Sequence, residues 1–121
     1  MVEGAFGLKR GEIWTVSGGA DYTGKPRPAI VVQSDKFDLT QSITVCPLTR
    51  TLVDAAPARF PIVPSHANGL RAISHAMVDK IATLPKSKAG RRLGVLTAAE
   101  IALLNQTLVL FLGLADEHSG T

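Results

Sequence analysis

The chain has almost no cysteine: Cys46 is the only one in 121 residues. A single thiol cannot form an internal disulfide, and it cannot supply the paired CxxC ligands of a zinc ribbon or a redox site. The spacing of His66 and His75 matches no metal-binding motif either. We therefore expect a protein of a reducing compartment whose function needs neither a metal nor another cofactor.

Long apolar runs are also missing. No stretch is long enough to span a bilayer, and the N-terminus lacks a charged-then-apolar leader with a small-residue cleavage site. These absences predict a cytoplasmic protein without a membrane association. Hydrophobic residues make up 45% and charged residues 19% of the chain, which is typical of a folded domain and too apolar for a disordered one. The length fits one domain over residues 1–121.

The balance of charge is basic but not strongly so. Lys and Arg number 13 against 10 Asp and Glu, which gives a net charge of +3 and a pI of about 9.4. A surplus of this size suits a polyanionic partner, and it equally suits an ordinary solvated surface. Charge alone leaves both interpretations open, so the motifs must decide between them.

The first half of the chain has the pattern of a sheet. Residues 12–16 alternate between polar and apolar, which predicts a half-buried strand, and residues 29–33 form a β-branched run typical of a fully buried strand. Between them, residues 17–24 contain three glycines and predict a mobile surface loop. Lys25 and Arg27 each precede a proline, which holds them extended.

The pattern continues to a C-terminal helix. Residues 43–48 predict a strand that ends at Thr49, residues 58–64 a weaker strand at a sheet edge, and residues 76–81 a further strand. Asn68 and Gly69 mark a tight turn, and residues 34–41 form a polar connection with one helical turn. Residues 84–96 are interpreted as a basic, glycine-containing connection.

The helix is predicted to begin after Thr97, because Thr97 and Glu100 have the spacing of a capping box, and to end near Gly113. We expect Leu104, Leu108, Phe111 and Leu112 to share one face. Other leucines and valines extend the apolar surface around the helix. Such a helix needs a second partner besides its own sheet, and we expect a homodimer.

Four motifs in this order are characteristic. They are Arg10-Gly11-Glu12-Ile13-Trp14, then Lys25-Pro26-Arg27-Pro28 before a β-branched strand, then Pro47-Leu48-Thr49, then Val78-Asp79-Lys80-Ile81. Each motif is weak alone, but the ordered set over residues 8–114 resembles the MazF/PemK family of growth-inhibitor toxins. The resemblance implies a mainly β fold with α: an SH3-like twisted antiparallel sheet or small barrel with a C-terminal helix, of the CcdB/PemK-like type.

The resemblance also implies an activity and partners. Members of the family form homodimers, are paired with a cognate antitoxin protein, and cleave single-stranded RNA at short sequences without a metal. The expected products carry a 2′,3′-cyclic phosphate and a 5′-hydroxyl. The family's catalytic arginine and threonine match Arg27 and Thr49 in this chain.

The chemistry fits those two side chains. When the 2′-hydroxyl of RNA is the nucleophile, the protein must assist proton transfer and stabilise charge on the phosphoryl oxygens. The planar guanidinium of Arg27 can hold two such oxygens, while its high pKa makes it a poor base. We assign Arg27 to transition-state stabilisation and Thr49 to a hydrogen bond at the same phosphate.

Other residues are supporting candidates. Asp21 and Tyr22 are candidates for RNA contact on the predicted loop. Lys25, Lys86 and Arg91 are candidates for contacts with phosphates. Asp79 is interpreted either as holding the site through a nearby cation or as part of a structural salt bridge.

The remaining notable side chains have plainer interpretations. Trp14 is expected in the core. His66 and His75 suggest acid–base chemistry because histidine titrates near neutrality, but we interpret both as incidental. Some family members have an arginine where this chain has Met77, so the general base is not identified.

Two other functions remain as alternatives. A CcdB-like gyrase poison shares the fold type but relies on a C-terminal Trp-Gly-Ile, whereas this chain ends in Glu-His-Ser-Gly-Thr. A non-catalytic SH3-like RNA-binding module would bind RNA without cutting it. A gyrase supercoiling assay and an RNA cleavage assay separate the three functions.

Overall fold

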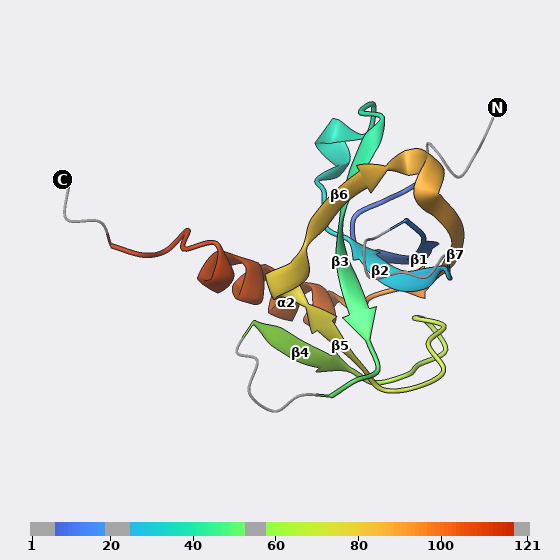
Figure 1. Ribbon diagram of the computed structural model, residues 1–121. Helices are drawn as coiled ribbons and strands as arrows, with labels where there is room; N and C mark the ends of the chain where they lie inside the picture. The colour runs from blue at the N-terminus through green and yellow to red at the C-terminus, as the bar shows by residue number, and fades with distance from the viewer. Residues whose placement is uncertain (1–6, 19–24, 53–57, 118–121) are drawn as a thin grey trace.

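The computed structural model describes residues 7–18, 25–52 and 58–117 of the chain (Figure 1). Its strands are β1 (Glu12–Val16), β2 (Arg27–Val31), β3 (Ser42–Thr49), β4 (Arg59–Ile62), β5 (Ser74–Met77), β6 (Ala82–Pro85) and β7 (Ala89–Val95), and its α-helix is α2 (Ala98–Phe111). Three short 3-10 turns are η1 (Asp35–Phe37), η2 (Val78–Lys80) and η3 (Lys86–Lys88). The expected mainly β fold with a C-terminal helix is confirmed.

β3 is the central strand of the sheet. The strand order is β4-β5-β3-β2-β1-β7, and β6 pairs with the first half of β3. All the pairings are antiparallel. Figure 1 shows β3 running the length of the molecule, with β4 and β5 near one end and β6 crossing near the other. The weak strand predicted at residues 58–64 is β4, and it lies at the edge of the sheet as expected.

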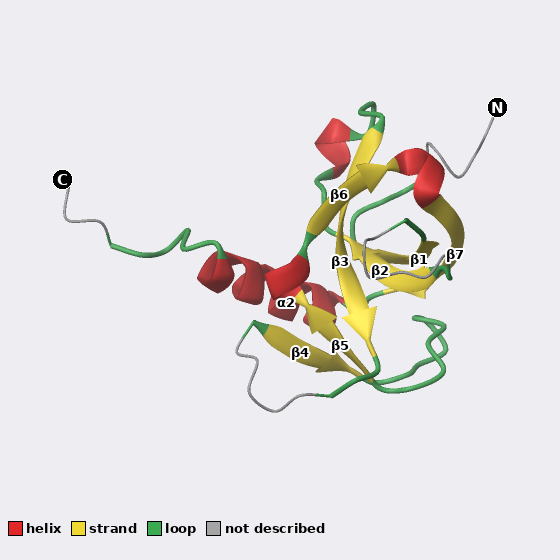
Figure 2. Ribbon diagram, in the orientation of Figure 1, coloured by secondary structure: helices red, strands yellow, loops and turns green. Residues whose placement is uncertain are grey.

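Side-chain alternation along the strands divides the core in two. On one face Trp14, Val16, Ala29 and Val31 pack with apolar residues of β3. On the other face the core includes Ile13 and Ile30 of the sheet and Leu104 of α2. Figure 2 shows β6, η3 and β7 curving around β1 and β2. The sheet therefore curls around the first cluster and carries the helix on the second.

The helix begins as the capping box predicts. The Thr97 hydroxyl accepts a hydrogen bond from the Glu100 backbone at 3.1 Å, and the Glu100 carboxylate accepts one from the Thr97 backbone at 2.8 Å. After the last turn Gly113 has φ +69°, a left-handed conformation that favours glycine. Both predicted ends of the helix are confirmed.

The predicted apolar face of α2 is only partly correct. Leu104 is fully buried and Leu108 is partly buried, but Phe111 and Leu112 are 46% and 49% exposed. The C-terminal turns of α2 project beyond the sheet, so nothing in the described residues covers them (Figure 1). None of the helices in these residues is long and apolar enough to cross a membrane.

Two predicted elements are wrong. Residues 84–96 are not a connection, because most of them belong to β6 and β7. Gly90 and Gly94 suggested a loop, but each lies where a side chain has no room: a Cβ at Gly94 would meet the Ala67 carbonyl oxygen, and one at Gly90 would meet the Thr15 hydroxyl. The strand predicted at residues 76–81 ends at Met77, and Val78–Lys80 form a 3-10 turn.

Candidate functional site

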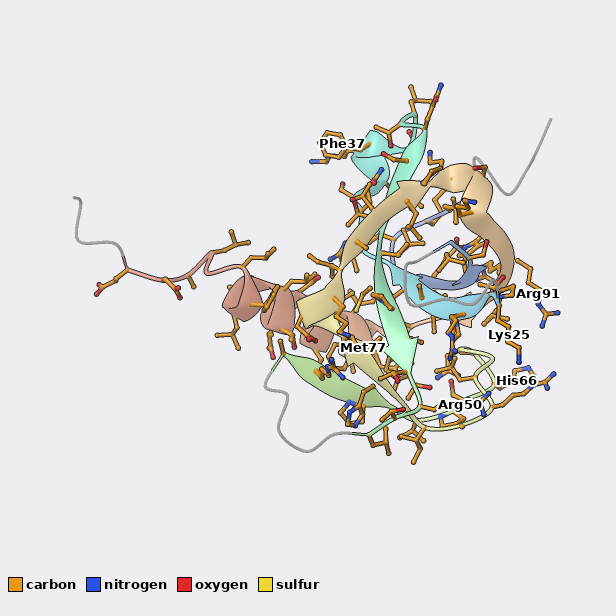
Figure 3. The ribbon with its side chains drawn as sticks, in the orientation of Figure 1. Lys25, Phe37, Arg50, His66, Met77 and Arg91 are labelled. Atoms are coloured by element: carbon orange, nitrogen blue, oxygen red, sulfur yellow. The ribbon has the colours of Figure 1, made fainter. Side chains whose placement is uncertain are left out.

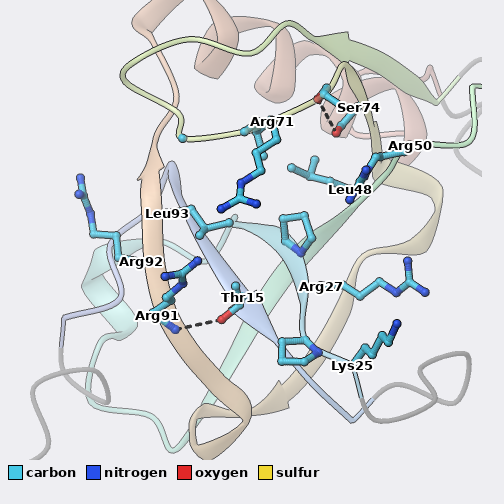
Figure 4. Close-up of a pocket in the computed structure, with 15 residues that line it drawn as sticks. Thr15, Lys25, Arg27, Leu48, Arg50, Arg71, Ser74, Arg91, Arg92 and Leu93 are labelled. Carbon is cyan, nitrogen blue, oxygen red and sulfur yellow. Dashed lines mark hydrogen bonds between the residues drawn. The ribbon is translucent and has the colours of Figure 1, made fainter.

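A groove of about 590 Å³ lies over the ends of several strands (Figure 4). One wall comes from β1, β2 and β7, and the other from residues 69–72 with Ser74 and the end of β3. The lining residues are Thr15, Lys25, Pro26, Arg27, Pro28, Leu48, Arg50, Gly69, Leu70, Arg71, Ala72, Ser74, Arg91, Arg92 and Leu93. The groove therefore collects segments that are far apart in the sequence.

The charge of this groove is strongly one-sided. Among the described residues that line it, none is acidic and six are basic: Lys25, Arg27, Arg50, Arg71, Arg91 and Arg92. The whole chain carries only +3, so much of its positive charge is concentrated here. Leucine and proline side chains form the apolar part of the lining. Such a surface attracts a chain of negative charges and also offers apolar contacts to the groups between them.

The wall formed by residues 69–72 is fixed by Asn68, which is fully buried. The Asn68 side-chain oxygen accepts hydrogen bonds from the backbone of Ser65 at 3.0 Å and of Leu70 at 2.9 Å. The Val95 backbone donates to the Ala67 carbonyl at 2.9 Å, which holds the loop against β7. The predicted turn at Asn68-Gly69 is confirmed, and Gly69 has φ +68°.

The basic side chains extend into the groove from both walls. Figure 4 shows Arg71 and Arg91 pointing toward one another, from the loop and from β7. The Arg91 backbone donates to the Thr15 hydroxyl at 3.0 Å, which fixes the strand that carries Arg91. The Arg92 Nε donates to Glu12 Oε2 at 2.8 Å, so its charge is partly balanced. The groove thus has a defined shape before a ligand binds.

Arg27 is placed at the start of β2, two residues earlier than the predicted strand. Arg27 is exposed and lines the groove together with Lys25. In the β1–β2 pair it lies opposite Val16 of β1. Figure 4 shows Arg27 and Lys25 at one end of the groove and Arg91 and Arg92 at the other. The structure therefore brings three of the expected residues, Lys25, Arg27 and Arg91, to one groove, and Figure 3 shows Lys25 and Arg91 on the same side of the molecule.

Thr49 lies at the end of β3 and does not line the groove. Its neighbours Leu48 and Arg50 do, because side chains alternate along a strand. Thr49 pairs with His75 of β5, and its Oγ1 accepts a hydrogen bond from the Thr51 backbone at 3.1 Å. The β2–β3 register ends at Ala29 opposite Pro47. If this register is extended by two residues, from Ala29 to Arg27 and from Pro47 to Thr49, Arg27 lies opposite Thr49.

Asp79 belongs to a structural salt bridge, one of its two interpretations. Both its oxygens accept hydrogen bonds from Arg59, at 3.0 and 3.1 Å. The hydrogen bond from Arg59 lowers the pKa of Asp79, and the same pair raises the pKa of Arg59. Neither residue lines the groove. Nearby, burial and the Asp79 charge raise the pKa of Cys46 to about 12, so this thiol stays protonated and is not a nucleophile.

Lys86 is another expected site residue that the structure does not bring to the groove. Lys86 is buried, and its ammonium donates a hydrogen bond to the Asp38 backbone carbonyl. It holds the turn after η1 and is unavailable to a ligand, contrary to expectation. Asp21 and Tyr22 lie outside the described residues. Trp14 is in the core as expected, and its Nε1 donates to Glu12 at 3.0 Å.

Sequence reasoning missed Arg50 and Arg71. Arg50 directly follows Thr49, and Arg71 follows the Asn68-Gly69 turn, so their proximity to recognised motifs was the available signal. In the described residues, no group of three or more His, Cys, Asp or Glu side chains is arranged to hold a metal ion.

Comparison with known proteins identifies the family. The model of the family described as PemK-like, MazF-like toxin of type II toxin–antitoxin system matches residues 9–112. A Mycolicibacterium smegmatis protein named "Probable endoribonuclease MazF" is 41% identical over 108 residues, covering 89% of this chain and 99% of that protein.

Solved structures agree with this match. An endoribonuclease in complex with its cognate antitoxin from a mycobacterial species has a TM-score of 0.73 at 26% identity, covering 88% of this chain and 95% of that chain. The Mycobacterium tuberculosis toxin MazF-mt6 has a TM-score of 0.71 at 23% identity, covering 84% and 96%, and shows the shared fold. With most of its length matched by the family model and by a relative 41% identical, this chain belongs to the PemK-like, MazF-like toxins of type II toxin–antitoxin systems.

Proposed function

We propose that this chain is an endoribonuclease toxin that cuts single-stranded RNA at Arg27 and Thr49, that the basic groove beside them holds the adjoining part of the RNA, and that residues 1–121 act as one domain in the cytoplasm. The observation that carries the proposal is the groove itself, whose lining within the described residues has six basic and no acidic side chains. The name of the 41% identical relative supports the same activity.

The proposed reaction uses the substrate's own nucleophile. The 2′-oxygen attacks the adjacent phosphorus, the bond from phosphorus to the 5′-oxygen breaks, and a 2′,3′-cyclic phosphate and a 5′-hydroxyl are formed. The 2′-hydroxyl loses one proton and the 5′-oxygen gains one, so no net proton or electron is exchanged. The protein must stabilise the extra negative charge on the phosphoryl oxygens while this happens.

Arg27 and Thr49 are the proposed catalytic residues. Arg27 projects from a strand whose register is fixed by β1, so its guanidinium is held at the edge of the groove, where its positive charge can stabilise a phosphate. Thr49 follows on the neighbouring strand, where its hydroxyl already accepts from the Thr51 backbone and keeps its own proton to donate. Lys25 and Arg91 would hold the phosphates on either side.

The decisive experiment is cleavage of a mixed-sequence RNA in excess chelator, with both ends of the products mapped. We expect cuts that leave 2′,3′-cyclic phosphate and 5′-hydroxyl ends, and no cut where the nucleotide 5′ to the bond is 2′-deoxy. Binding without cutting would instead favour a non-catalytic RNA-binding module. Inhibition of gyrase supercoiling without RNA cleavage would favour a CcdB-like poison.

A cognate antitoxin is the second proposed partner. The mycobacterial neighbour at 26% identity was solved as a complex with its cognate antitoxin. An acidic segment that folds over the groove would be complementary to its six basic side chains. Co-expression of the protein encoded beside this chain should relieve growth arrest, and growth that is unaffected by expressing this chain alone would contradict the toxin assignment.

We also propose a homodimer, supported by the end of α2. Leu110, Phe111, Leu112 and Leu114 are between 46% and 74% exposed and lie close together in sequence. A cluster of this kind is more stable when a second surface covers it. Light scattering should give twice the 12.8 kDa chain mass at micromolar concentration, whereas a monomer would disprove the proposal.

A further inference from the structure

The strands place one row of side chains across the end of the sheet. Pro61 of β4 pairs with His75 of β5, and His75 pairs with Thr49 of β3. Arg27 of β2 pairs with Val16 of β1, and the continued β2–β3 register sets Arg27 beside Thr49. Directly opposed residues of antiparallel strands point to the same face with Cβ atoms about 5 Å apart. The polar centre of this row is therefore an imidazole, a hydroxyl and a guanidinium.

The surroundings of His75 favour one tautomer. Its Nδ1 is enclosed and has no hydrogen-bond partner, the one buried side-chain nitrogen or oxygen in the described residues that lacks a partner. An enclosed N–H without an acceptor is rarer in proteins than an enclosed acceptor without a donor. This geometry favours an N–H on Nε2, which is not enclosed in this way. His75 is only partly buried, so Nε2 can meet a ligand.

We propose that His75 donates a hydrogen bond from Nε2 to the phosphate being cleaved, beside Arg27 and Thr49. This inference rests on the proposed RNA cleavage and adds a third residue to that site. The ring acts as a hydrogen-bond donor and not as the base: its proton stays on Nε2, while water accepts the 2′-hydroxyl proton and gives one to the 5′-oxygen. Developing charge on the phosphoryl oxygens then meets three fixed donors from three adjacent strands.

Other residues are less suited to this position. Asp79, on the turn that follows β5, is held by both donors of Arg59. Glu12 accepts hydrogen bonds from Trp14 and Arg92. Acidic side chains would also repel the phosphate. His75 is paired directly with Thr49 across β3 and β5, which makes it a neighbour of a phosphate bound at Thr49.

The test compares three substitutions that separate the two ring nitrogens. The amide nitrogen of H75Q can occupy the position of Nε2, that of H75N the position of Nδ1, and H75F keeps the ring without a donor. We expect kcat for a defined RNA to fall about 10-fold to 10²-fold in H75F and H75N, and only a few-fold in H75Q, with KM changed little. Melting temperatures of all three variants show whether folding is intact.

His66, an exposed histidine of the loop after β4, provides the matched control, and H66F should cut like the parent protein. Full activity in H75F would overturn the proposal, as would equal losses in H75Q and H75F. A ring that merely fills space would be replaced adequately by phenylalanine. If the parent protein does not cut RNA at all, the proposed function fails first.

A second measurement does not depend on cleavage. A DNA oligonucleotide of the same sequence lacks the 2′-hydroxyl and serves as an uncleavable probe. Its addition should shift the NMR signals of the His75 ring nitrogens, with Nε2 shifting most, and should leave those of His66 unchanged. Binding of the probe without a change at His75 would exclude the contact.

Discussion

Arginine has different roles in the groove and at the edge of the sheet formed by β4. At this edge, the Arg59 side chain is only 14% exposed and donates two hydrogen bonds to Asp79. In the groove, six basic residues lie together, and the part of the lining that the structure describes has no acidic residue. The attraction between Arg59 and Asp79 stabilises the folded chain, whereas neighbouring cations in the groove repel one another and destabilise it. The groove therefore lowers the stability of the folded chain and in return provides a binding site for an anionic ligand.

This contrast predicts opposite consequences for mutation. Loss of a groove cation should weaken activity and leave the fold intact or slightly more stable. Loss of Arg59 should weaken the fold and leave the chemistry unchanged.

The largest effect is expected at Arg27. R27A should reduce RNA cleavage by about 10²-fold or more, because one preorganised donor to the developing charge is lost. R27K should recover little of this, since an ammonium cannot reproduce the planar fork. T49A should cost less and T49S should retain most of the rate. Single-turnover rates with circular dichroism as a folding check measure all four, and an unchanged rate in R27A would refute the assignment of the site.

A large structural effect is expected at Gly94. Its substitution by alanine would drive a Cβ into the Ala67 carbonyl and Asn68, and would push the groove wall away from β7. We expect a loss of about 2–3 kcal/mol in unfolding free energy, measured by urea denaturation. Alanine at Gly18 meets only the flexible end of Lys88 but is strained by φ +92°, so G18A should cost less. Equal stability of G94A and the parent protein would show that the wall is not fixed as described.

Moderate effects are expected at Arg71 and Arg91. Each alanine variant should raise KM roughly 3-fold to 10-fold with little change in kcat, and should reduce the slope of log affinity against log salt by about one. Lys36 and Lys80 are exposed lysines outside the groove, so K36A and K80A serve as matched controls. Fluorescence anisotropy with a labelled RNA at several salt concentrations gives both quantities. An identical salt dependence in groove and control variants would contradict binding in the groove.

The smallest effect is expected at Arg59. Because Arg59 lowers the pKa of Asp79, the pair stabilises the fold fully above the ordinary pKa of aspartate, about 3.9, and loses this contribution as the pH falls through the lower folded-state value. R59M should reduce stability at neutral pH by roughly 1 kcal/mol. Its unfolding free energy should fall less steeply than that of the parent protein below about pH 4. If the unfolding free energies of R59M and the parent protein change in parallel from neutral to acidic pH, the Arg59–Asp79 pair is not the cause of the pH dependence.

The fold was largely predictable because its signals are local. Alternation along residues 12–16 and the capping box at Thr97 each follow from a few neighbouring side chains, and both were confirmed. The failures arose where a local signal had a distant cause. Gly90 and Gly94 suggested a loop, but Thr15 and Ala67, far away in sequence, require glycine inside β7.

The site was less predictable for the same reason. Arg27 was selected by its motif and Arg91 by its charge, and the structure brings both to one groove. Lys86 has the same charge, yet the Asp38 carbonyl binds its ammonium in the interior. Arg71 was missed because only the folding of residues 63–73 against β7 brings it opposite Arg91. Which cations face a ligand is decided by tertiary contacts that leave no mark on the sequence.

β3 holds hydrogen bonds to β2, β6 and β5 along a single stretch of backbone. Each of its amide protons can exchange with solvent only when the hydrogen bond to the neighbouring strand on that side opens, and three strands hold β3 in this way. Thr49 ends this strand, so the backbone that leads to the proposed site should take up deuterium more slowly than that of the surface turns. The toxin would then keep its catalytic activity until the whole chain unfolds. An inhibitor would have to block the site directly, because it could not inactivate the site by unfolding it locally.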